Sequence, residues 1–280
     1  MRYTFRYEME TLVKNIAAMF RKNSFFYVVG ITLVLAFKHF YSAAGANDLV
    51  WILEPIAHLV ELAAGIHFEH ESTAGFVSLS NRIVIAPACA GINFLIICFS
   101  TLFFTLVSRM KTSVKKSIWL VISIVSAYLV TLWTNSVRII ISIYLYRAQI
   151  YGEWVTPERV HRLAGTLIYV SVLVVTYLAA ERMVGRFCGK GFPGAETAMP
   201  PKVPYVPHLI CPPFAWYLAI AVFVPLLNGS LHRQGARFLE HSIFVLAATL
   251  SIFLVWLVVP LLKKKKIDIS EETKEKRASQ

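Results

Sequence analysis

A single cysteine lies where one long apolar stretch of the chain begins. The run Pro87-Ala-Cys89-Ala-Gly-Ile-Asn93 opens this stretch, and its proline favours a break in the backbone just before a helix. Cys89 is therefore expected in or just before the first helical turn, where the positive end of the helix dipole stabilises a thiolate. The thiolate is the nucleophilic form of cysteine. The alternative is that Cys89 is only a small buried side chain, as free cysteines often are.

The other three cysteines differ from Cys89 in their expected surroundings. Cys98 falls within an apolar stretch and is expected in the core. Cys188 and Cys211 fall in a loop that is expected in the cytosol, where thiols stay reduced. No two cysteines have the CxxC spacing of a metal site. Cys89 is thus the one thiol expected at the outer face, with no evident disulfide partner.

An amide and a cation lie at the end of another apolar stretch, in Asn135-Ser-Val-Arg138. Residues at positions i and i+3 share a helix face, so both side chains are expected to point the same way. Three isoleucines follow Arg138, and an arginine in such surroundings is costly unless it faces a polar cavity. Arg138 is therefore a functional candidate. The alternative is that it only extends its guanidinium to lipid headgroups.

An imidazole opens a further apolar stretch, in His161-Arg-Leu-Ala-Gly165. Histidine titrates near neutrality and can move protons, and Gly165 permits the close approach of a neighbouring helix. The alternative is an ordinary interfacial histidine. Together, a thiol and an imidazole form the set for covalent acyl transfer, in which a guanidinium can stabilise the oxyanion. This chemistry needs no metal and no cofactor.

These three runs, in this order and spacing, resemble the exosortase/archaeosortase family, with the exosortase K branch as the candidate subfamily. The resemblance covers about residues 48–182. It implies a membrane-embedded cysteine peptidase or transpeptidase that processes C-terminal sorting signals, each made of a short motif, one spanning helix and a basic end. It also implies Cys89, Arg138 and His161 as the catalytic residues. Ala90 departs from the pattern of many members, which have serine there, and this leaves the subfamily and the substrate motif open.

The composition indicates a membrane protein. Hydrophobic residues make up 57% of the 280 residues and charged residues only 16%, whereas soluble chains carry about a quarter charged residues. A helix that spans a bilayer needs about 20 apolar residues. Six stretches are assigned as spans: 24–43, 91–108, 117–134, 162–181, 213–228 and 241–262. We therefore predict an all-α bundle of about six transmembrane helices, without a second large soluble domain.

Positive charge gives these helices an orientation. Lysine and arginine cluster in the N-terminus, after the second and fourth spans, and in Lys263–Lys266, and six spans place all these clusters on one side. By the positive-inside rule this side is the cytosol. Both termini are then cytosolic at the plasma membrane, and Cys89, Arg138 and His161 face outward. Contact with anionic lipid explains the net charge of +12 better than binding to nucleic acid does.

Three further features lie in or next to the segments predicted to be external. Residues 48–66 have the pattern of an amphipathic helix at the outer interface, and residues 75–86 are predicted to be extended. The third apolar stretch continues to about residue 146, so its helix either projects from the bilayer or breaks and lies along the interface. Histidines such as His67 and His70 could hold a metal, but a solvated outer segment is the expected explanation.

These assignments divide the chain into five parts. They are a cytosolic amphipathic N-terminus (1–23), an exosortase-like catalytic membrane core (24–182), a Gly/Pro-rich cytosolic loop (183–212), a C-terminal transmembrane hairpin (213–262) and a charged cytosolic tail (263–280).

The function predicted from the sequence is a cysteine peptidase or transpeptidase. Cys89 is expected to form a thioester, His161 to transfer the proton and Arg138 to hold the oxyanion, with Asn135 orienting it. The expected partners are membrane-tethered substrate proteins with a C-terminal sorting signal, and membrane lipids. Two alternatives stay open: a transporter or channel in which Arg138 binds an anionic solute, and a non-catalytic assembly factor. The paired broken helices and inverted repeats typical of many transporters are not visible in the sequence.

Overall fold

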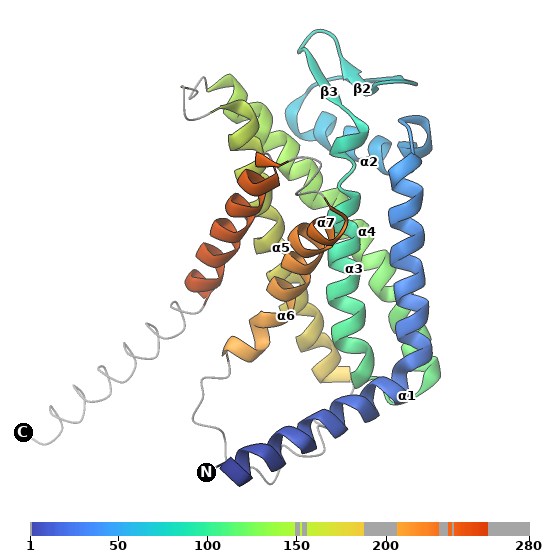
Figure 1. Ribbon diagram of the computed structural model, residues 1–280. Helices are drawn as coiled ribbons and strands as arrows, with labels where there is room; N and C mark the ends of the chain where they lie inside the picture. The colour runs from blue at the N-terminus through green and yellow to red at the C-terminus, as the bar shows by residue number, and fades with distance from the viewer. Residues whose placement is uncertain are drawn as a thin grey trace, which may run out of the picture. The chain divides into compact units, whose positions relative to one another are not determined.

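The computed structural model describes residues 2–148, 152, 156–187, 206–229, 235, 236 and 238–256. Within these residues the chain is mainly helical (Figure 1), and five helices are long and apolar enough to cross a membrane. They confirm the predicted all-α transmembrane bundle. The chain forms two compact units, Met1–Ile140 with Ala180–Lys190 and Ile141–Ala179 with Gly191–Gln280.

The first unit begins with α1 (Arg2–Ala43), a single helix of 42 residues. It joins the predicted cytosolic N-terminus to the first predicted span without interruption, and its ribbon bends along its length in Figure 1. Residues Arg21–Ala43 form the part that can span a membrane. α1 packs against α3 (Ile92–Leu106). A small residue permits the close approach, because a Cβ on Gly30 would lie only 2.6 Å from the ring of Phe103.

The amphipathic helix predicted over 48–66 is present as α2 (Val50–Ala64). The apolar side chains of one face are fully buried, as the helical periodicity requires. α2 is fixed to α4 (Ser113–Arg147) by Tyr128, whose hydroxyl donates a hydrogen bond to the carbonyl of Trp51 at 2.8 Å. The rings of these two residues also stack, with centroids 5.7 Å apart. The position of α2 at the outer membrane interface stays a prediction.

A small antiparallel sheet follows α2, in the order β1 (Glu69–Glu71), β2 (Gly75–Ser78) and β3 (Ile83–Ile85). β2 and β3 are extended, as predicted for parts of 75–86, but residues 79–82 form a turn between them, so the predicted single extended segment is a hairpin. β1 and the pairing of the strands were not predicted. The glycine that opens β2 lies at φ +107°, and a Cβ there would clash with a backbone oxygen of β3. β3 ends shortly before Cys89, so the sheet positions the start of the cysteine motif.

α3 and α4 complete the first unit. α3 is the most enclosed of the five long apolar helices, because most of its side chains are buried. α4 is one continuous helix of 35 residues, roughly 50 Å at 1.5 Å per residue. The sequence left open whether this helix breaks after residue 134. It does not break, and it continues beyond Ile140 into the second unit.

The second unit contains the start of α5 (Pro157–Phe187), then α6 (Val206–Leu218), which continues through a π-helical turn into α7 (Val224–Leu227). α5 confirms the fourth predicted span. The fifth corresponds to a shorter apolar helix, Cys211–Leu227, near the lower length limit for crossing a bilayer. A last helix, Phe238–Trp256, agrees with the sixth. Outside the described residues lie Cys188, most of the predicted loop 183–212, the cluster Lys263–Lys266 and the predicted tail 263–280.

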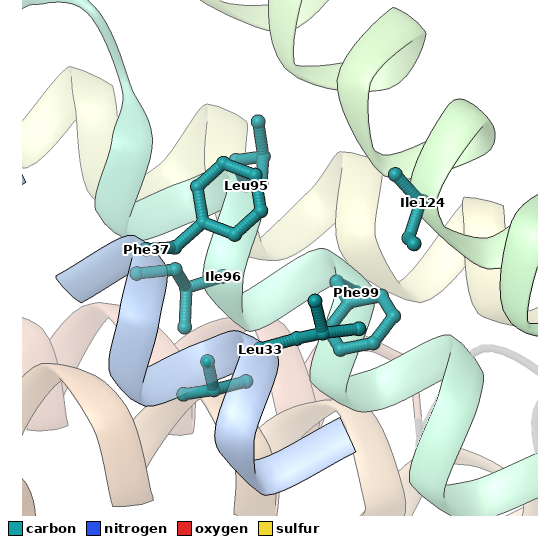
Figure 2. A pocket seen from close by; sticks show the side chains of 7 residues that line it. Leu33, Phe37, Leu95, Ile96, Phe99 and Ile124 are labelled. Carbon is teal, nitrogen blue, oxygen red and sulfur yellow. The ribbon is translucent and has the colours of Figure 1, made fainter. Parts of the chain in front are cut away.

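A small cavity of about 20 Å³ lies among α1, α3 and α4 in the first unit. Its walls are apolar, and Figure 2 shows the side chains of Leu33, Phe37 and Phe99 around it. A space of this size is large enough for one water, but a bound water needs polar partners, which these walls do not offer. The predicted catalytic residues do not line this cavity, so we interpret it as imperfect packing of the core.

Candidate active site

Cys89 lies in a short connection between the sheet and α3. The residues Pro87–Cys89 form one 3-10 turn, in which the Cys89 amide donates to the carbonyl of Ala86 at 2.7 Å. Gly91 then adopts a left-handed conformation, with φ +73°, and caps α3, which begins at Ile92. The cysteine is therefore just before the helix and not within its first turn. Its side chain is half-buried, so the thiol is neither enclosed in the core nor freely exposed.

Asn135 of α4 contacts the cysteine turn directly. Its side-chain amide donates a hydrogen bond to the backbone carbonyl of Cys89. Asn135 is fully buried, so this bond satisfies a polar group that would otherwise be costly to enclose. The structure thus brings together two motifs that are 46 residues apart in the sequence. The sequence predicted that Asn135 supports Arg138, and it did not predict that Asn135 holds the turn of Cys89.

Arg138 lies one turn after Asn135 on the same face of α4, and its side chain is half-buried. Tyr41, in the last turn of α1, interacts electrostatically with both Cys89 and Arg138. Tyr41 was not identified from the sequence. A tyrosine at the end of a spanning helix is ordinarily explained as an interface anchor, so only the packing of α1 reveals its place beside these two residues.

Lys38, one turn earlier on α1, reaches the start of α3. Its Nζ donates to Oδ1 of Asn93 at 3.0 Å. The ammonium also lies 5.9 Å from the centroid of the Tyr41 ring, within the range of a cation–π attraction. Asn93 belongs to the cysteine motif, but the sequence indicated no separate role for it. Lys38 of α1 therefore adds a positive charge, besides Arg138 of α4, near the start of α3 that follows Cys89.

His161 belongs to the second unit, near the start of α5. Its Nδ1 lies 2.7 Å from the hydroxyl of Ser142 on α4. Such a bond orients the ring and leaves proton transfer to Nε2. Ser142 was not identified from the sequence, although it follows Arg138 by one helical turn and lies on the same face. The structure thus joins Cys89 to Asn135 in one unit and His161 to Ser142 in the other.

A comparison with known protein families identifies the kind of protein. Residues 19–178 match the family described as transmembrane exosortase, which is more than half of the chain. The chain belongs to the transmembrane exosortase family. The match includes Cys89, Asn135, Arg138 and His161, and this exosortase is an integral membrane protein. No curated protein and no solved structure matches the chain.

The family match bears on the substrates of this exosortase and on the part of the chain that the family describes. The family implies protein substrates that carry sorting signals. The match ends at residue 178, so α6, α7 and the helix Phe238–Trp256 lie beyond it. Assignment to the exosortase K branch stays a prediction.

A histidine–carboxylate chain lies on the segment that the sequence predicts to be external. The Oε1 of Glu61 lies 2.5 Å from Nδ1 of His67, and its Oε2 lies 3.7 Å from Nδ1 of His58. The hydrogen bond and the charge of Glu61 raise the pKa of His67 above its ordinary value. His70 packs against the ring of Phe76. Within the described residues no three histidine, cysteine or acidic side chains converge as ligands for a metal.

Proposed function

We propose that this exosortase is a cysteine peptidase or transpeptidase that cleaves C-terminal sorting signals of membrane-tethered proteins at the outer face of the plasma membrane. The family match supports this proposal, because it includes Cys89, Arg138 and His161. The observation that carries it is the hydrogen bond from Asn135 to the Cys89 carbonyl, which brings two of the motifs to one place. A substrate whose signal includes a spanning helix would reach the enzyme laterally through the lipid.

The reaction begins at Cys89. Its sulfur attacks the scissile carbonyl carbon while the thiol proton passes to Nε2 of His161. Ser142 orients this imidazole through the contact with Nδ1. The new carbon–sulfur bond places negative charge on the carbonyl oxygen, and the guanidinium of Arg138 holds this oxyanion.

The tetrahedral intermediate collapses when His161 gives the proton to the leaving amine and the carbon–nitrogen bond breaks. The acyl part stays on Cys89 as a thioester, and the C-terminal helix of the substrate leaves with its amine. Water or a second amine then attacks the thioester and restores the thiol, which completes hydrolysis or transpeptidation respectively. In this scheme Asn135 holds the turn of Cys89 in place, since its amide is bonded to that carbonyl.

The parts of the chain have distinct roles in this proposal. Residues 24–182 form the catalytic membrane core, whose active site faces outward. The N-terminus (1–23), the loop 183–212 and the tail 263–280 are cytosolic, where their basic side chains meet anionic lipid. The hairpin 213–262 follows this core in the sequence and also spans the membrane.

The test is the processing of a membrane-tethered protein that carries such a signal and is encoded near the exosortase. Cys89→Ala and Cys89→Ser should both leave this substrate at full length. Cys98→Ala is the matched control, because it removes a fully buried thiol of α3 and should preserve processing. An adduct of substrate and Cys89 that hydroxylamine releases would report the thioester. Normal processing by Cys89→Ser, at normal enzyme levels, would contradict the proposal and favour a transporter or an assembly factor.

A further inference from the structure

The start of α5, which carries His161, contacts a helix that the family match does not include. The match ends at residue 178, whereas the C-terminal helix Phe238–Trp256 lies wholly beyond it. Glu240 lies in the first turn of that helix. Both the start of α5 and the C-terminal helix belong to the second unit.

Glu240 holds two arginines that lie on either side of His161 in the sequence. The Nε of Arg159 donates to its Oε1 at 2.9 Å, and Nη2 of Arg162 lies 3.7 Å from the same oxygen. Arg159 and Arg162 are three residues apart, so they share one face of α5. The three side chains are only 27% to 37% exposed. The cluster is therefore better shielded than an ordinary surface ion pair, whose net contribution is small.

From this geometry we infer that the C-terminal helix is part of the catalytic apparatus, and that Glu240 is a positioning residue for His161. Two restraints then act on the imidazole from different helices. Ser142 of α4 bonds to Nδ1 and sets the rotation of the ring. Glu240 fixes the turn of α5 from which His161 extends. The inference rests on the proposed role of His161 as the group that accepts the thiol proton.

A purely structural role is the alternative, in which the ion pairs only hold two helices together. The two explanations differ in one respect. A positioning residue acts through His161, so its loss has no further effect when the histidine is already absent. A structural ion pair affects the protein whether or not the imidazole is present. A double-mutant cycle separates these cases.

The experiment follows the reactivity of the Cys89 thiol and needs no substrate. The full-length enzyme in membranes is treated with iodoacetamide, and the rate of alkylation at Cys89 is measured by mass spectrometry. The thiolate is the reactive species, so His161→Ala should slow alkylation on the order of tenfold. Glu240→Gln should slow it about threefold or more by weakening the same thiol–imidazole pair. In the His161→Ala background, Glu240→Gln should cause no further slowing.

Glu181→Gln provides the matched control. Glu181 accepts from Arg109 at the same distance of 2.9 Å. It lies near the other end of α5, roughly 30 Å from His161 along the helix at 1.5 Å per residue. This substitution should leave alkylation of Cys89 unchanged. If Glu240→Arg slows the reaction, the charge-swapped pair Arg159→Glu with Glu240→Arg should recover the rate.

The outcomes distinguish a failure of the inference from a failure of the proposed function. A slowed rate in His161→Ala with an unchanged rate in Glu240→Gln would overturn the inference and leave the proposed function standing. Equal slowing by Glu240→Gln with and without His161 would also overturn it, because Glu240 would then act independently of the histidine. An unchanged rate in His161→Ala would contradict the thiol–imidazole pair itself, on which both proposals rest.

Discussion

Asn135 of α4 donates a hydrogen bond from its side-chain amide to the backbone carbonyl of Cys89. Gly91 leaves room for this contact, because a Cβ at that position would lie 3.2 Å from the amide nitrogen of Asn135, which is tighter than most Cβ contacts. The bond holds the turn Pro87–Cys89 against α4, one helical turn before Arg138. It gives a physical reason for a glycine two residues after the cysteine and for an amide one turn before the arginine.

Replacing Asn135 by leucine tests whether this bond positions the nucleophile. Leucine has the same branched arrangement of side-chain heavy atoms and suits a fully buried helix position, but it leaves the Cys89 carbonyl without its donor. We expect a loss of about 1–3 kcal/mol in the free energy of unfolding. We also expect substrate processing to fall while the enzyme still inserts. Thermal unfolding of the purified enzyme and the ratio of processed to full-length substrate measure the two effects.

Thr131→Val is the control for this substitution. Thr131 lies one turn before Asn135 and is also fully buried beside Gly91. In the part of the chain that the structure describes, its hydroxyl has no hydrogen-bond partner, so valine should be tolerated without loss of stability or processing. If Asn135→Leu behaves like Thr131→Val, the amide is not needed to hold Cys89.

The predicted orientation gives a second test. Reporter domains fused after residues 70, 150 and 235 should be external, because four clusters of lysine and arginine place the opposite ends of the spans in the cytosol. Fusions after residues 112 and 195 should be cytosolic. A fusion after residue 270 should also be cytosolic. An external signal at 112 would put Cys89 on the cytosolic side and contradict the proposed site of cleavage.

The helices and their order could be predicted because they depend on local composition. A bilayer requires about 20 apolar residues for each spanning helix, so each span can be recognised in the sequence as an apolar stretch of this length. α2 was predicted for a similar reason, since one apolar and one polar face repeat at helical spacing. The continuity of α4 could not be predicted, because both a straight helix and a broken one satisfy the same apolar pattern.

The partners of the candidate site residues could not be predicted from the sequence. The bonds of Asn135 to Cys89 and of Lys38 to Asn93 join residues 46 and 55 positions apart, and no local pattern specifies them. Ser142 is a different case. Its position one helical turn after Arg138 was visible in the sequence, but serine is common in helices and only the contact with His161 distinguishes it.

The hydrogen bond between Glu61 of α2 and His67, which lies just before β1, links these two elements and should depend on pH. The hydrogen bond to Glu61 raises the pKa of His67, so the folded state favours the protonated imidazole. The link is then fully formed below the ordinary histidine pKa of about 6.5 and is lost as the pH rises through the raised value. Hydrogen exchange of residues 65–71, corrected for its intrinsic pH dependence, should show protection that falls over this range.

His67→Gln should remove this dependence, because glutamine does not titrate. His70→Gln is the control, since His70 packs against Phe76 and should leave the dependence intact. A pH dependence that persists in His67→Gln would show that another group controls the link. Because His67 is exposed, the effect should be confined to this connection and should not alter the overall stability.

Arg138→Lys tests whether Arg138 donates to the oxyanion or only places a positive charge near lipid headgroups. Lysine keeps the positive charge but lacks the planar, forked donors of the guanidinium, so it should insert normally and fail to reach the oxyanion. The loss of one such donor costs about 10²–10³ in rate, and the substrate should therefore stay largely at full length. Arg147→Lys, at the exposed last turn of the same helix, should process the substrate normally. Near-normal processing by Arg138→Lys, with equal amounts of enzyme in the membrane, would remove Arg138 from the catalytic residues and support an anchoring role.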